Sequence, residues 1–125
     1  MFNNIKTKND VFLVALKLAK DTATSKINSE RDQAILSGVE FNGRAYQSDD
    51  KSVSDLIAVA TLSIINNDII VPWLTTQNEV VDLDSTDIQL LAGLFAAQKT
   101  AHIIEARKRK DLVILAETIE QVEVI

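Results

Sequence analysis

The sequence predicts an α+β fold of three helices and two β-hairpins, in the order helix, hairpin, helix, hairpin, helix. The first observation is Asn42-Gly43 between short apolar segments, the strongest short hairpin signal in a sequence. The second is a pair of β-branched segments, 69–74 and 80–83, that flank a polar turn. The third is helical spacing of apolar residues before, between and after these segments. We expect long N- and C-terminal helices and one small antiparallel sheet, made by the two hairpins joining edge to edge.

The first helix is expected to start after Asp10 as its N-cap and to stop at Gly38. Residues 1–9 before it are predicted to form a polar arm or a short edge strand. The apolar stripe of the helix is narrow and rich in alanine, and consists of Phe12, Leu16, Ala19, Ala23, Ile27 and Ala34. Such a stripe is typical of close packing against one other helix. That partner is either the chain's own third helix or a copy from a neighbouring chain.

The first hairpin requires a turn with positive φ at both central residues, which Asn42 and Gly43 tolerate best. After it, Ser48-Asp49-Asp50 is a cap cluster for the second helix. The predicted apolar face of this helix consists of Val53, Leu56, Ile57, Ala60, Ile64 and Ile65. Residues 66–68 end the helix, which we expect to be the main core helix.

The second hairpin contains Pro72 and Trp73 in its first strand. Because proline has no N–H to donate, this strand is expected at a sheet edge or with a bulge. Trp73 is expected to pack against the second helix. Asp84 and Asp87 resemble a capping box that opens the third helix, and Gly93 inside that helix is a position for close helix contact.

The C-terminal segment, residues 112–125, is more apolar than a solvated terminus. We predict that it binds another protein subunit; folding back on the first helix is the alternative. The core is expected to end before the basic run Arg107–Lys110. The chain after Ile119 is expected to form a short strand added to a sheet edge, since Val122 and Val124 are separated by Glu123. The candidate partner-binding residues are Leu112, Val113, Ile114, Leu115, Ile119, Val122 and Val124.

Composition limits the chemistry. The chain has 125 residues, a net charge of −5, no cysteine and one histidine, so disulfides, thiolate sites and His-rich metal sites are excluded. His102 has no orienting partner in the sequence, and a surface or half-buried packing role is favoured over catalysis. The acidic clusters lack the spacing of calcium loops and are interpreted as caps. We therefore expect no enzyme, cofactor or metal. Arg107–Lys110 is interpreted as a solvated helix segment, with nucleic-acid contact as the disfavoured alternative.

Several short motifs together resemble a known family. They are Glu30-Arg31-Asp32, Gly38, Phe41-Asn42-Gly43, Tyr46, Asp49, Ser52, Pro72-Trp73, Thr76, Asn78, Leu83 and His102. In order and spacing they are similar to an uncharacterised domain of tailed bacteriophages, found in tail-fibre-associated and tail-fibre-assembly proteins. The resemblance covers residues 28–118 and implies a place in a phage tail, with no catalytic residues.

The expected function is therefore a structural component of a phage tail, associated with the tail fibre or baseplate and acting by protein–protein assembly. The alternatives are an assembly chaperone that the virion does not retain, and a small regulatory or nucleic-acid-binding protein. We expect an N-terminal arm and helix (1–37), a compact domain (38–111) and an interaction segment (112–125). The expected partners are other tail subunits in a homo- or hetero-oligomer, without membrane or nucleic acid. With no signal peptide or spanning segment in the sequence, synthesis is expected in the host cytoplasm and the final location in the virion.

Overall fold

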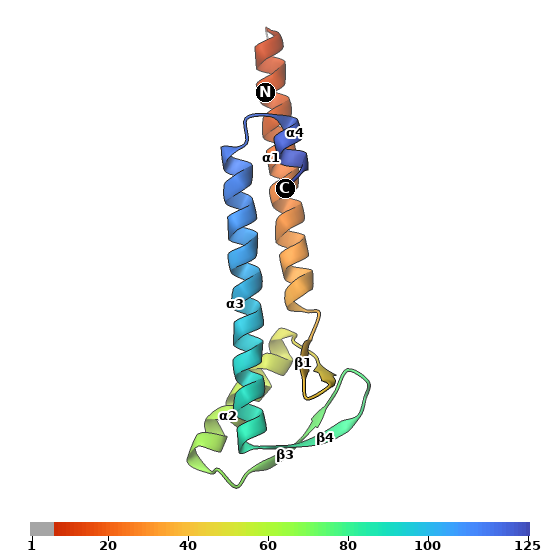
Figure 1. Cartoon of the computed structure of the whole chain (residues 1–125), viewed down its shortest axis with the longest axis vertical. Helices are drawn as coiled ribbons and strands as arrows, with labels where there is room; N and C mark the ends of the chain where they lie inside the picture. Colours follow the sequence, from red (N-terminus) through yellow and green to blue (C-terminus); the bar gives the residue numbers. More distant parts are fainter. Residues whose placement is uncertain (1–6) are drawn as a thin grey trace. The chain divides into compact units, whose positions relative to one another are not determined.

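The computed structural model describes residues 7–125, and it confirms the α+β class (Figure 1). Its elements are α1 (Lys8–Ile35), β1 (Val39–Phe41), β2 (Arg44–Tyr46), α2 (Asp50–Ile65), β3 (Ile70–Leu74), β4 (Val80–Asp84), α3 (Ser85–Leu115) and α4 (Ile119–Glu123). The chain divides into two compact units. Unit 1 contains residues 7–31 and 103–125 of the described chain, and unit 2 contains residues 32–102.

In unit 1, α1 begins earlier than the sequence suggested. The main-chain N–H of Asp10 donates to Oγ1 of Thr7 (3.1 Å), and the N–H of Thr7 donates to Oδ2 of Asp10 (3.2 Å). This reciprocal pair is a capping box, so Thr7 is the cap and Asp10 lies within the first turn. The prediction of Asp10 as N-cap was wrong, because Thr7 holds the N-cap position and Asp10 is the third residue of the helix, whose side chain bonds back to Thr7. The predicted arm or strand lies, apart from residues 7–9, outside the described residues.

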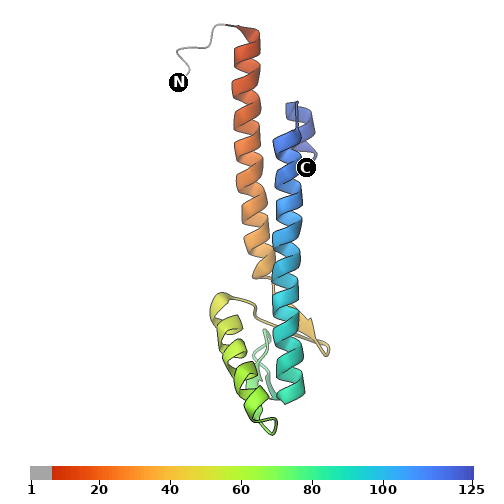
Figure 2. The same ribbon diagram turned by 90° about the vertical axis from the view of Figure 1, so that its left-hand side faces the viewer.

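Unit 1 has a thin core between α1, the end of α3 and α4. One cluster contains Leu16, Ala116 and Val122, and the next contains Ile27, Ala106 and Val113. Figure 2 shows α1 and α3 side by side in this unit. Ala19 and Ala23 pack against these clusters. Because Ile27 of α1 packs with Ala106 and Val113 of α3, the first helix has the chain's own third helix as a partner, which was one of the two predicted alternatives.

A lysine of α1 donates a hydrogen bond to the C-terminal end of α3 in unit 1. The helix ends at Leu115, and the last carbonyls of a helix lack intrahelical donors. The Nζ of Lys20 donates to the main-chain oxygen of Ile114 (2.9 Å). A cation at a helix C-terminus also interacts favourably with the helix dipole.

The short segment after α3 is helical rather than extended. Thr118 caps α4, and its Oγ1 accepts the N–H of Gln121 (3.1 Å). Helical geometry places Ile119 and Val122 on the same side, and both pack in the cluster with Leu16. The predicted strand was wrong because the alternation of Val122 and Val124 covers too few residues to outweigh this cap.

Unit 2 begins with the first hairpin, whose turn agrees with the prediction. Asn42 and Gly43 both have positive φ, 52° and 77°. Val39 pairs with Tyr46 across the hairpin, and both side chains are buried. Ser48 connects this hairpin to the end of α1, since its Oγ donates to the oxygen of Ile35 and accepts the N–H of Gly38.

The core of unit 2 lies between the hairpins, α2 and the first turns of α3. Its buried members are Val39, Tyr46, Leu56, Leu83, Ile88, Leu91 and Phe95. Asp49 caps α2 as expected, and hydrogen bonds from the hydroxyl and N–H of Ser52 lower the pKa of its carboxyl. Half of the predicted face of α2 is confirmed, because Val53, Leu56 and Ala60 pack in this core. The prediction was wrong for Ile57, Ile64 and Ile65, which are exposed. The helical spacing of the inward side continues from Ala60 to the buried Ser63 and leaves these three isoleucines outside it.

The hairpins form two separate two-stranded sheets, which corrects the predicted joint sheet. Between them, the N–H of Thr76 donates to the oxygen of Ala45 (2.9 Å), and Arg44 pairs with Glu79 (3.3 Å). The contact therefore joins strand β2 to the turn of the second hairpin, and not to one of its strands. Pro72 lies in β3, which pairs with β4 alone, as expected for an edge strand, and Trp73 packs against the core cluster to which Leu56 of α2 belongs.

The third helix opens as predicted. The N–H of Asp87 donates to Oδ1 of Asp84 (2.8 Å), and the N–H of Asp84 donates to Oδ2 of Asp87 (3.3 Å). Gly93 is exposed, and a Cβ added there would meet nothing within 4 Å. The predicted close helix contact at Gly93 is therefore absent.

Candidate functional site

Within residues 7–125, no group of three or more His, Cys, Asp or Glu side chains lies close enough to hold a metal ion. His102 is half-buried, one of the two positions that the sequence favoured. None of the described helices combines the length and the apolar composition that a membrane span requires.

The basic run on α3 is used inside the chain. Arg107 pairs with Asp111 one turn later (2.8 Å). Lys110 donates to Oδ1 of Asn28 on α1 (2.9 Å). Arg109 is half-buried and contacts both α1 and the C-terminal segment. The prediction of a fully solvated segment was wrong for Arg109 and Lys110, and the core continues past the run to Val113.

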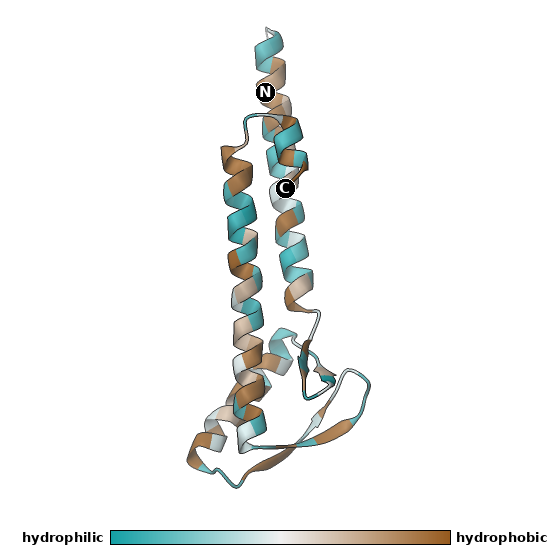
Figure 3. Ribbon diagram, viewed as in Figure 1, coloured by the Kyte–Doolittle hydropathy of each residue, from teal (hydrophilic) through white to brown (hydrophobic). Residues whose placement is uncertain are grey.

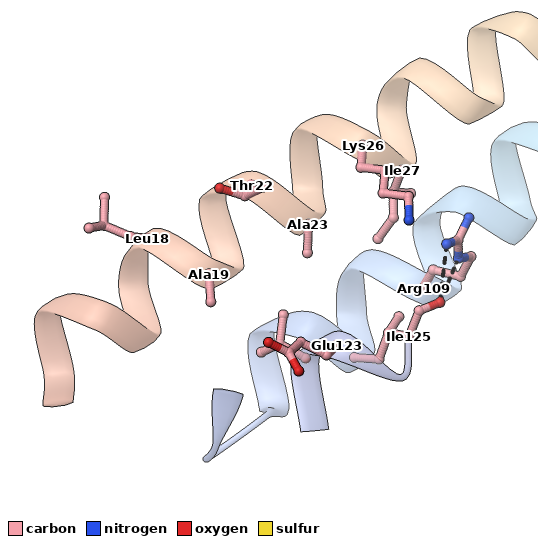
Figure 4. A pocket seen from close by; sticks show the side chains of 10 residues that line it. Leu18, Ala19, Thr22, Ala23, Lys26, Ile27, Arg109, Glu123 and Ile125 are labelled. Atoms are coloured by element: carbon pink, nitrogen blue, oxygen red, sulfur yellow. Dashed lines mark hydrogen bonds between the residues drawn. The ribbon is translucent and has the colours of Figure 1, made fainter. Parts of the chain in front are cut away.

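Arg109 on α3 forms hydrogen bonds to two other segments of unit 1. Its Nη1 donates to Oε2 of Glu30 at 2.6 Å. Its Nε and Nη2 donate to the main-chain oxygen of Ile125 at 3.3 and 3.1 Å (Figure 4). The hydrogen bond from Arg109 lowers the pKa of the Glu30 carboxyl. One guanidinium group therefore holds both α1 and the last residue of the chain against α3.

The predicted partner-binding residues fall into two groups. Val113 and Val122 are buried within unit 1, and Ile119 is half-buried, so these three stabilise the chain's own fold. These three residues pack against α1, which was the predicted alternative to binding another subunit. Leu112, Ile114, Leu115 and Val124 remain 55%, 65%, 75% and 85% exposed. In Figure 3 the end of α3 that carries three of them is brown, the hydrophobic colour.

A groove in unit 1, which the sequence did not reveal, lies between α1 and the end of the chain. It encloses about 390 Å³. Figure 4 shows its two walls. The α1 wall consists of Leu18, Ala19, Thr22, Ala23, Lys26 and Ile27. The other wall consists of Arg109, Val122, Glu123 and Ile125. The groove exists because α4 turns the chain back along α1, and residue spacing gives no signal for such a reversal.

A second apolar surface lies on the outer side of the β3–β4 hairpin in unit 2. Side chains alternate along a strand, and Val71, Trp73, Val81 and Leu83 pack on the core side. The outer side carries Ile70, Pro72, Leu74 and Val80, all exposed, which we call the hairpin face. Leu74 and Val80 are paired across the strands, whereas Asp82 and Asp84 oppose Pro72 and Ile70. Both sides of this small sheet are therefore largely apolar.

The two units differ in charge around these surfaces. Residues 32–102 contain ten acidic and three basic side chains, whereas the remaining residues contain eight acidic and ten basic ones. The hairpin face thus belongs to a strongly acidic unit. The groove belongs to a unit with nearly balanced charges.

Comparison with known protein families gave a match that covers most of the chain. A protein-family model described as "Domain of unknown function (DUF4376)" matches residues 18–125. This range includes unit 2 with its hairpin face, the whole groove, and unit 1 except for residues 7–17. The searches of curated proteins and of solved structures returned no match.

Proposed function

The chain belongs to the DUF4376 family, whose description assigns no function, and from its own residues we propose that it is a structural component of a bacteriophage tail. It acts by protein–protein assembly near the tail fibre or baseplate. The place in a tail is supported by the motif resemblance over residues 28–118. The assembly mode is supported by the surfaces of the two units.

The observation that carries the assembly mode is the hairpin face. Ile70, Leu74 and Val80 are 66%, 53% and 65% exposed, on a sheet whose other side already covers the core. Contiguous exposed apolar side chains on a small domain are typical of interaction sites. The acidic side chains Asp82 and Asp84 lie on the same side. A partner with an apolar patch bordered by Lys or Arg side chains would complement this surface.

The test is mass spectrometry of purified virions of the phage that encodes the chain. We expect the chain in intact particles, at a fixed copy number relative to the tail fibre. Its presence in infected cells but absence from particles would favour the assembly chaperone instead. Its absence from tail-assembly intermediates as well would contradict both roles.

A surface variant connects this test to the hairpin face. Leu74→Lys should leave the chain folded, because Leu74 is exposed, but should remove it from the particle. Leu90→Lys is the matched control, since Leu90 is a 54% exposed leucine on α3. Incorporation of both variants at the normal copy number would show that the hairpin face is not the contact.

A further inference from the structure

The groove in unit 1 borders a second apolar stripe on α1. The buried stripe of the helix contains Leu16, Ala23 and Ile27. The second stripe contains Val11, Ala15, Leu18 and Thr22, at spacings of four, three and four residues. This spacing is that of the d and a positions of a heptad, along which two helices pack. Val11 and Leu18 are 55% and 51% exposed, so this seam is open.

The residues beside the seam carry complementary charges. With Val11 and Leu18 at d, Asp21 takes the g position and Lys26 the e position. In a parallel helix pair, g of one helix faces the e position five residues later on the other, and such pairs set orientation. Asp21 is 61% and Lys26 is 72% exposed in their side chains. Their contacts within the chain, to Lys17 and Glu30, are exposed ion pairs of little strength.

The groove lies on the e side of this seam. Its α1 wall includes the e residues Ala19 and Lys26, and Arg109 adds a second cation on the opposite wall, beside the acidic Glu123. In the parallel arrangement, Val14 of a second helix at position g faces Ala19. An apolar side chain then enters the part of the groove lined by Ala19 and Ala23, and Asp21 of the second helix approaches Lys26.

We infer that unit 1 binds a second copy of this chain through α1, as a parallel helix pair that fills the groove. A second copy supplies the apolar seam, the side chain opposite Ala19 and the charge opposite Lys26. Self-association is also compatible with the balanced charges of unit 1. The seam covers only two heptads before Ser25 and Ser29, so a weak dimer is expected. This inference goes beyond the proposed tail role and does not depend on it.

The first experiment is sedimentation equilibrium of the full chain over a concentration series. We expect the average mass to rise from one chain toward two. Leu18→Glu should weaken dimerisation at least about tenfold, since it puts a charge into the seam. Leu13→Glu is the matched control, because Leu13 is 52% exposed on the opposite side of α1, and should dimerise like the wild type. A wild type that stays a single chain, or equal dimerisation by Leu18→Glu, would overturn the inference.

The second experiment tests the parallel alignment through charge exchange. Asp21→Lys alone and Lys26→Asp alone each place like charges across the pair, and each should weaken the dimer about threefold at low salt. An equimolar mixture of the two variants restores opposite charges at both positions and should restore the wild-type affinity. Circular dichroism checks that each variant keeps its helix content. Two single variants with unchanged affinity, or a mixture no tighter than its parts, would show that the helices are not paired in this register.

Discussion

The two units of this protein are stabilised in different ways. Unit 2 buries a compact group of large side chains, among them Tyr46, Leu56 and Phe95, each at most 1% exposed. Unit 1 has two small clusters of three buried residues, and one residue in each is alanine. Between α1 and α3, unit 1 adds polar bridges from Arg109 and Lys110.

The different cores explain why the two units expose different surfaces. A narrow helical core buries one stripe of each helix and leaves the neighbouring stripe open, as on α1. A compact core can cover the inner side of a small sheet completely and leave its outer side for a partner, as on β3–β4. We therefore expect substitutions in unit 2 to act mainly through apolar burial, and those in unit 1 mainly through polar contacts.

The largest effect is expected from Phe95→Ala in unit 2. Phe95 is 1% exposed, and truncation of a buried phenylalanine costs about 3–5 kcal/mol of unfolding free energy. Val113→Ala in unit 1 removes fewer atoms from a thinner core, and should cost roughly 1–3 kcal/mol. Urea unfolding followed by circular dichroism measures both, and Trp73, the one tryptophan of the chain, reports unit 2 by fluorescence. Leu94→Ala, beside Phe95 but 38% exposed, is the control. An equal loss in both units would remove the contrast between the cores.

A backbone substitution should have the next largest effect. Gly38 has φ of +96°, and a Cβ there would lie 3.0 Å from the main-chain oxygen of Tyr46. Gly38→Ala should cost about 1–3 kcal/mol, since alanine is strained at positive φ and crowds this oxygen. Gly43→Val should also destabilise the chain, because its φ is +77°, although no atom lies within 4 Å of the added Cβ. If thermal unfolding were unchanged in both variants, neither positive φ would be a constraint on unit 2.

The sequence predicts unit 2 better than unit 1, and the reason is physical. Asn42-Gly43, Asp49 and the Asp84–Asp87 box act through hydrogen bonds and dihedral angles within a few residues, so their signals are local. Within unit 2, the sequence does not show which side of α2 is exposed, because this depends on the elements that pack against the helix. In unit 1, Val113 and Val122 are buried only because α4 turns the chain back along α1. The apolar character of residues 112–125 indicated that this segment makes contacts, but it did not show which of its side chains stay exposed. The groove required contacts between the two ends of the chain, which no local pattern contains.

The expected contribution of polar contacts to the stability of unit 1 can be tested by lowering the pH. The hydrogen bond from Arg109 lowers the pKa of Glu30 in the folded chain. A carboxyl with a lowered folded pKa stabilises the fold above its unfolded pKa, and this contribution is lost as pH falls through the folded pKa. Glu30→Gln should therefore be less stable than the wild type at neutral pH, and the difference should shrink as pH falls below the ordinary carboxyl range. Urea unfolding midpoints at a series of pH values measure it. A difference that stays constant with pH would mean that the ionised carboxyl is not the stabilising group.

The smallest expected effect is a gain of stability at Gly93. This residue is exposed on α3 within unit 2, and a Cβ added to it would meet nothing within 4 Å. Its φ is not positive, so alanine fits the helical backbone without strain. Replacing glycine by alanine then reduces the conformational freedom of the unfolded chain, and Gly93→Ala should stabilise the protein by about 0.4–1 kcal/mol. The opposite signs expected for Gly93→Ala and Gly38→Ala separate a glycine that the fold requires from one that it merely tolerates. A loss of stability at Gly93 would indicate that a neighbouring chain packs closely against this helix. Cross-linking of an Ala97→Cys variant would then identify the contact, since Ala97 is exposed one turn further along the same side.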